Sequence, residues 1–135
     1  MSNDHIDSEG FRANVGIILC DDAGRLLLAG RVGSRGWQFP QGGMLQGESP
    51  RDDLFREINE EVCLVREEVD VLAVTSDWLL YRLPDRYILR DSRPLCIGQK
   101  QRWFLLRLTG PEEKLSLDHT DTPEFDRWRW VEFWH

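Results

Sequence analysis

The sequence predicts a single domain with a mixed β-sheet and one helix, of the α/β or α+β class. Two observations carry this prediction. Short segments rich in β-branched, aromatic and other apolar residues recur along the chain, while one stretch has its apolar residues at helical spacing. The helix falls between strands, which favours a mixed sheet. With 135 residues, 41% apolar and 30% charged, the chain is large enough for a core and has an ordinary globular composition.

The strand-like segments punctuate the chain, and turns or loops separate them. A turn at 21–24 joins the first two, so these are expected to form a hairpin. Residues 84–94 carry three arginines between two prolines and predict a mobile basic loop. The predicted strands cover residues 14–20, 25–31, 37–39, 69–78 with a continuation to 83, 99–108 and 125–133.

The helix lies within the stretch from Gly42 to Leu64, GGMLQGESPRDDLFREINEEVCL. Ser49 is expected to be the N-cap, and Pro50 fits the first helical position, where a missing N–H costs nothing. Apolar side chains recur at helical spacing on one face of this helix, at Leu54, Phe55, Ile58 and Val62.

Three carboxylates, of Glu57, Glu60 and Glu61, converge on another face of the same helix. Like charges at this spacing destabilise a helix by a few tenths of a kcal/mol per pair. Arg56 is one candidate for a compensating charge, and a divalent cation such as Mg²⁺ or Mn²⁺ is the better one. A solvated acidic face is the alternative interpretation. The glycines before the helix favour the metal, because they let backbone approach whatever the carboxylates hold.

The spacing of Gly42, Glu48 and the run REINEE at 56–61 resembles the Nudix box. The resemblance implies a Nudix-type α/β/α sandwich with a mixed sheet. The polar residues 1–10 are expected to form a disordered tail, and residues 11–135 the hydrolase domain. The resemblance also implies that the family's C-terminal helix is missing, either by truncation or because this is a naturally short form. Cys63 stands where the family usually has glycine. If the helix ends in a left-handed cap there, a cysteine costs about 1–2 kcal/mol.

Segments outside the box resemble one branch of the family, the bacterial RNA pyrophosphohydrolases. These segments are GWQFPQGG, CIGQKQRWFLLRL and TPEFDRWRWVEFW. The resemblance implies a Mg²⁺-dependent enzyme that converts 5′-triphosphate or 5′-diphosphate RNA ends to 5′-monophosphate and so promotes RNA decay. A related branch, which shares much of this pattern, hydrolyses dinucleoside polyphosphates such as diadenosine tetraphosphate. A non-catalytic module that binds nucleotide or protein is the third hypothesis, and the complete carboxylate set counts against it.

The resemblance also assigns the reaction centre. Glu57, Glu60 and Glu61 match metal-binding positions, where more than one Mg²⁺ or Mn²⁺ ion is expected. A carbonyl of Gly42 or its neighbour is a further ligand. Glu124 matches an acidic residue that reaches the site from a loop. Glu60 is the first choice of general base, with Glu57 and Glu124 as alternatives.

Two residues are expected to support this centre. Glu48 and Arg56 are expected to pair and to hold the loop and the helix in register.

Arg12, Arg31 and Lys100 match positions that contact phosphate or line the site in the branch. Tyr81 is a further candidate, which would line the pocket or stack on a base. For each of these cations, a solvated surface charge with no role in binding is an equally good interpretation. For Tyr81, a core aromatic is the commoner role.

Charge and composition limit the partners. A net charge of −7 excludes a general nucleic-acid coat, so any nucleic acid is a substrate held locally, and no DNA partner is expected. No apolar run reaches the length of a membrane helix, and the first ten residues do not form a signal peptide. Three widely spaced cysteines argue against disulfides and favour the cytoplasm. A protein activator stays an open question.

Overall fold

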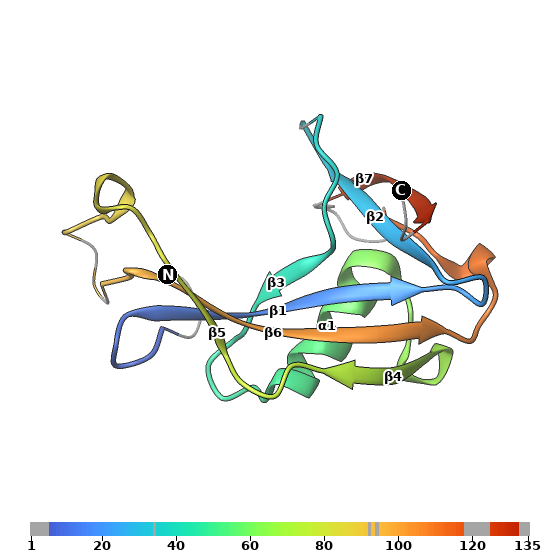
Figure 1. Cartoon of the computed structure of the whole chain (residues 1–135), viewed down its shortest axis with the longest axis horizontal. Helices are drawn as coiled ribbons and strands as arrows, with labels where there is room; N and C mark the ends of the chain where they lie inside the picture. The colour runs from blue at the N-terminus through green and yellow to red at the C-terminus, as the bar shows by residue number, and fades with distance from the viewer. Residues whose placement is uncertain (1–5, 34, 92, 94, 118–124, 133–135) are drawn as a thin grey trace.

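The computed structural model describes residues 6–33, 35–91, 93, 95–117 and 125–132, and it places seven strands in one sheet (Figure 1). The strand order is β4-β6-β1-β2-β7, while β3 pairs with β1 and β5 pairs with β6. The strands are β1 (Phe11–Cys20), β2 (Arg25–Arg31), β3 (Gln41–Gly43), β4 (Val69–Val74), β5 (Leu79–Arg82), β6 (Gly98–Leu108) and β7 (Phe125–Glu132).

The centre of the sheet is a long parallel pair, β1 with β6, which runs in register from Phe11 opposite Gly98 to Cys20 opposite Arg107. The other named strand pairs are antiparallel. Strands far apart in the chain therefore lie side by side, β1 with β6 and β2 with β7.

The predicted hairpin of the first two strands closes only at its turn, because Cys20 opposite Leu26 is the one paired position. Beyond it β2 leaves β1 and pairs with β7 along its length. The N-terminal half of β1 pairs instead with the short strand β3. Figure 1 shows β2 and β1 diverging from their common turn, with β3 beside β1. The split leaves room for β3 to reach the helix.

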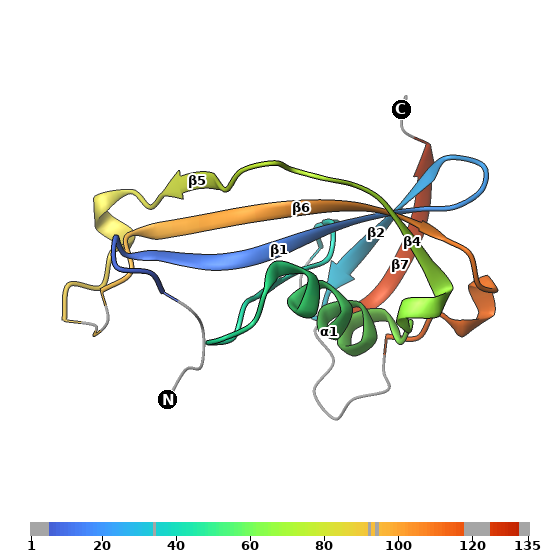
Figure 2. The ribbon, with the colours of Figure 1, turned by 90° about the horizontal axis from the view of Figure 1, so that it is seen from below.

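The helix α1 (Pro50–Val62) lies across one face of the sheet (Figure 2). Its apolar side chains Leu54, Ile58 and Val62 are at most 2% exposed. They pack on alternate residues of β1 and on β6, as the period of two in a strand requires. The buried cluster includes Val15, Ile17, Leu19, Leu27, Phe104, Leu106 and Phe125.

The opposite face of the sheet is also apolar at its centre. The indole of Trp103 lies over Gly16, where any Cβ would overlap it, and Phe39 meets the same indole edge-on. Trp103 also lines a shallow cavity of about 260 Å³, together with residues that include Ile18 and Leu105. Among the residues that the structure describes, no helix covers this face.

Most predicted elements are present, with differences where pairing decides the outcome. Residues 37–39 make one bridge, Gln38 to Ala29, and the strand forms later, at β3. The predicted strand from residue 69 to 83 is interrupted between β4 and β5. Three short 3-10 helices occupy loops: η1 (Arg66–Glu68), η2 (Asp85–Tyr87) and η3 (Glu112–Lys114). In the described part of the chain, no helix is long and apolar enough to cross a membrane.

Candidate active site

The ends of α1 are set by local chemistry. Ser49 is the N-cap, and its side-chain oxygen accepts a hydrogen bond from the N–H of Asp52 at 3.1 Å. Pro50 follows at the first helical position, as predicted. At the other end Cys63 adopts a left-handed conformation, with φ of 63° and ψ of 29°. Its N–H donates to the carbonyl of Asn59, so the helix ends in the cap that usually requires glycine.

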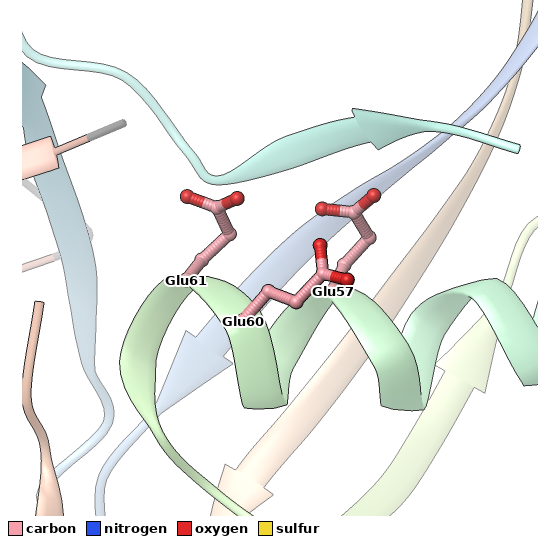
Figure 3. A group of neighbouring side chains, drawn as sticks. All are labelled: Glu57, Glu60 and Glu61. Atoms are coloured by element: carbon pink, nitrogen blue, oxygen red, sulfur yellow. The ribbon is translucent and has the colours of Figure 1, made fainter. Parts of the chain in front are cut away.

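Three glutamates gather on the side of α1 that faces β3 (Figure 3). Glu57, Glu60 and Glu61 each offer an oxygen atom within 4.8 Å of the others. Glu57 is 5% exposed, Glu61 is half-buried and Glu60 is exposed. Gly42 on β3 faces the Glu57 carboxylate so closely that a Cβ there would overlap it. This glycine is therefore needed for the close approach of strand and carboxylate.

Arg56 is the positive charge beside this cluster. Its guanidinium contacts Glu57 at 3.2 Å and Glu60 at 3.1 Å, and it donates to the carbonyl of Gly43 at 3.0 Å. One arginine does not neutralise the three glutamates together with Glu48, whose carboxylate it also contacts. The net charge around the cluster stays negative, which favours a bound cation.

Glu48 ties the loop before α1 to the helix. Its carboxylate accepts from Arg56 Nε at 2.8 Å and from the N–H of Leu45, also at 2.8 Å. The hydrogen bond from Arg56, with that from Leu45, lowers the pKa of Glu48, while partial burial opposes the shift. The same hydrogen bond raises the pKa of Arg56 above its already high ordinary value. Glu48 and Arg56 therefore stay charged and bridge the loop to the helix.

Asp53 is a residue that the sequence did not single out for this site. It is 0% exposed, lies one turn before Glu57, and accepts from Arg56 at 2.5 Å. Burial, with the negative charge of Glu57 next, raises the pKa of Asp53 to about 8, although Arg56 opposes the shift. A buried carboxyl group next to the metal-type cluster thus carries a proton at neutral pH. Its position three residues before Arg56 was the signal available in the sequence.

The carboxylates open into a polar cavity of about 760 Å³. Acidic groups stand on the side of α1, and Arg12 and Arg31 contribute positive charge from β1 and β2. The split between β1 and β2 brings these two arginines and the helix to one cavity. It is lined by Arg12, Asn14, Arg31, Gln38, Gln41, Gly42, Gly43, Leu45, Arg56, Glu57, Glu60, Glu61 and Gln99.

Two of the predicted substrate contacts, Lys100 and Tyr81, are not among the residues that line the cavity. Lys100 instead pairs with Asp7 at 3.0 Å and lies 4.8 Å from the ring centre of Trp78. Tyr81 lies on β5, with its Cα opposite that of Gln99. Glu124, the predicted loop carboxylate, lies outside the described residues.

The structure also places amide side chains in and beside the cavity, and the sequence did not point to them as site residues. Gln99 lines the cavity and accepts a hydrogen bond from Asn14 at 3.1 Å, and Gln101 donates to Gln41 at 3.1 Å. Side chains alternate along a strand, so Gln99 and Lys100 must point to opposite faces. The register of β6 could not be known from the sequence, and it selects Gln99 for the cavity.

The donor set fits a hard divalent cation. Carboxylate oxygens and a nearby strand carbonyl are the ligands such ions prefer. The observation in favour is the convergence of Glu57, Glu60 and Glu61 beside a glycine that leaves space for backbone approach.

Comparison with known proteins agrees with this arrangement. The model of the NUDIX domain matches residues 10–135. The RNA pyrophosphohydrolase of Ectopseudomonas mendocina (strain ymp) is 58% identical over 130 residues, which cover 96% of this chain and 82% of that protein. The RNA pyrophosphohydrolase of Alkalilimnicola ehrlichii is also 58% identical, over 96% of this chain and 72% of that protein. The chain therefore belongs to the Nudix hydrolase family, as its box predicted, and its enzyme class is phosphoanhydride hydrolase.

Solved structures confirm the fold class. An Ap4A hydrolase of C. elegans superposes with a TM-score of 0.65 and 20% identity, over 89% of this chain and 79% of that one. A dihydroneopterin triphosphate pyrophosphohydrolase of E. coli gives a TM-score of 0.68 and 18% identity, over 89% and 80%. At such identities the likeness concerns the fold alone.

Proposed function

We propose that this chain is an RNA 5′-pyrophosphohydrolase that uses Mg²⁺ or Mn²⁺, with more than one ion per site. It converts 5′-triphosphate or 5′-diphosphate RNA ends to 5′-monophosphate, which exposes RNA to decay. The observation that supports it is one cavity with carboxylates on one side and arginines on the other. A polyphosphate needs both, because cations held by the carboxylates and the guanidinium groups share its negative charge. The names of relatives at 58% identity point to the same substrate.

Glu57, Glu60 and Glu61 hold the ions in this proposal, with the Gly42 carbonyl as a further ligand and Glu124 as a ligand from its loop. When bound, the ions neutralise the phosphates and lower the pKa of the attacking water. Water attacks phosphorus, one P–O bond of the anhydride breaks, and pyrophosphate or phosphate leaves. A carboxylate takes the proton of the water, with Glu60 the first choice because it is the most exposed of the three, and Glu57 or Glu124 as alternatives.

Arg12 and Arg31 contact the phosphates, in keeping with their place in the cavity. Tyr81 and Lys100 remain proposed substrate contacts, although neither side chain lines the cavity itself. Glu48 and Arg56 support the site by fixing the loop against the helix. The reaction belongs in the cytoplasm, where such RNA ends are made, and it requires neither a membrane nor DNA.

The experiment that tests this function compares two substrates with Mg²⁺ present. One is a short RNA with a 5′-triphosphate, and the other is diadenosine tetraphosphate. Faster release of pyrophosphate or phosphate from the RNA supports the proposal. Preference for the dinucleotide assigns the chain to the sister activity, and silence on both from a folded, metal-binding sample favours a non-catalytic binding module.

Glu57→Gln and Glu60→Gln are the matched variants. Each should fold normally, with unchanged circular dichroism, and lose at least about 100-fold in turnover, the scale for a metal ligand or general base. Rates close to wild type in either variant would contradict the proposed role of that residue.

A further inference from the structure

A projecting arm extends from the sheet beyond the end of α1. We define the arm as residues 79–90, which comprise β5, the short helix η2 and the residues that follow. Figures 1 and 2 both show β5 and the first half of β6 running together away from the helix. The arm carries three arginines and one aspartate, so its charge is positive in a chain whose net charge is −7.

Aromatic rings and guanidinium groups are exposed on this arm. Tyr81 is 55% exposed and Tyr87 is 58% exposed. The guanidinium of Arg86 lies 4.9 Å from the ring centre of Tyr87. Arg82 and Arg90 both approach Asp85, at 3.7 Å, and remain more than half exposed. This combination is typical of proteins that bind single-stranded polynucleotides, because bases stack on aromatic rings and phosphates pair with cations.

The arm is continuous with the cavity. Arg12 on β1 is opposite Gln99 on β6, and Gln99 is opposite Tyr81 on β5. Residues directly opposite one another in a sheet project to the same face. Arg12 and Gln99 line the cavity, so Tyr81 is the next side chain in a row that leads out of it. The chain then continues within six residues to Arg86 and Tyr87.

From this row we infer that the arm is a binding track for the nucleotides that follow the 5′ end of an RNA substrate, with Arg86 and Tyr87 as its outer contact. The inference rests on the proposed function, since it extends the substrate from the same cavity. Exposed leucines at 79 and 80 would also suit a protein partner. The row to the cavity and the arginine over a tyrosine favour RNA, because a protein partner needs neither.

The test compares the wild type with Arg86→Ala/Tyr87→Ala. Arg107→Ala is the matched control, since it removes an exposed arginine at the opposite end of β6, where Arg107 pairs with Asp70. Turnover is measured on a 5′-triphosphorylated dinucleotide and on an unstructured 5′-triphosphorylated RNA of twelve nucleotides. The arm variant should raise KM for the longer RNA about tenfold, the scale of one lost stacking contact. Its kcat, and both constants for the dinucleotide, should stay at wild-type values.

Binding of a twelve-nucleotide RNA with a 5′-hydroxyl, followed by fluorescence anisotropy without Mg²⁺, separates the arm from catalysis. The arm variant should bind this RNA about tenfold more weakly, with a shallower dependence on salt, while Arg107→Ala binds as the wild type does. Failure of the wild type to hydrolyse RNA would refute the proposed function and leave this binding result intact. Equal losses on both substrates, or unchanged binding of the hydroxyl RNA, would overturn the track.

Discussion

Cys63 shows how one residue can oppose the conformation that its position requires. It ends α1 in the left-handed region, with φ of 63°, and it is the one residue other than glycine with positive φ in the described chain. A side chain with a Cβ is strained there by about 1–2 kcal/mol. The cost falls on stability, because the thiol contacts none of the carboxylates that form the site.

Cys63→Gly should therefore stabilise the fold by about 1 kcal/mol, which raises Tm by roughly 4 °C for a domain of this size. Thermal unfolding followed by circular dichroism measures the shift. Cys63→Ala is the control, since it removes the thiol and keeps the Cβ. A gain of equal size in the alanine variant would show that the thiol, rather than the backbone, is responsible.

Asp53 gives the fold a pH dependence. Burial raises the pKa of Asp53 to about 8 in the folded state, against an ordinary value of 3.8. Between these values the folded chain holds a proton that the unfolded chain has lost. The contribution of Asp53 to stability is therefore greatest below its ordinary pKa and falls as pH rises toward 8, by at most about 1.4 kcal/mol per pH unit.

Asp53→Asn should remove this fall. The free energy of unfolding is measured with urea at pH 6 and pH 8, in the presence of a chelator. It should fall between these pH values in the wild type and change less in the variant. Asp52→Asn, which changes an exposed carboxylate in the same helical turn, is the matched control. The same slope in wild type and Asp53→Asn would contradict the buried proton.

At the scale of elements, the site depends on how closely β3 approaches α1. Gly42→Ala would place a methyl group where the Glu57 carboxylate lies. Glu57 must then turn away from Glu60 and Glu61. Mn²⁺ affinity, measured by calorimetry, should fall at least about tenfold, a typical scale for disturbing a metal ligand. Tm should change little, because Glu57 can move toward the open cavity. Wild-type Mn²⁺ affinity would show that the carboxylate tolerates the methyl group.

The helix and its chemistry could be read from the sequence because they depend on neighbours within a few residues. Ser49, Pro50 and the spacing of the three glutamates determine where the helix begins and which face is acidic. Register across the sheet could not be read in this way. Lys100 was expected in the cavity, but the alternation along β6 gives that place to Gln99, and the pairing of β6 with β1 decides between them.

The predicted hairpin is confirmed only at its turn, and the reason is related. Local turn residues do bring β1 and β2 together at Cys20 and Leu26. The departure of β2 is stabilised by β7, about a hundred residues later, and no local pattern encodes that partner. The burial of Asp53 is a tertiary property of the same kind, since an aspartate in a first helical turn is ordinarily a solvated residue that favours the helix dipole.

At the scale of the molecule, β7 completes the sheet. It pairs with β2 along its length and contributes Phe125, which is 1% exposed. On the other face of β7, the guanidinium groups of Arg127 and Arg129 lie over the ring of Trp37, at 5.1 and 4.6 Å. The predicted division of this strand, tryptophans on one face and arginines on the other, is present.

Removal of residues 125–135 should therefore abolish cooperative unfolding, because β2, with the buried Leu27 and Ala29, would lose the one long pairing that it makes in the described part of the chain. Urea unfolding followed by tryptophan fluorescence would show a broad, shallow change. Phe125→Ala is the control: it should lose about 3–5 kcal/mol and keep a single sharp transition if enough stability remains. A sharp transition in the shortened chain would show that β7 is dispensable.

The long-range pairing of strands in this sheet determines when each strand can find its partner during translation. Residue 11 pairs with residue 98, and residue 25 with residue 132. During translation the first two strands leave the ribosome long before β6 and β7, with which they form their long pairings, are made. Their apolar residues must wait, at the ordinary pace of elongation, for several seconds or more. Contacts so distant in the chain also make folding slow once the partners arrive. Until β6 and β7 are made, these apolar residues remain exposed to aggregation and accessible to chaperones.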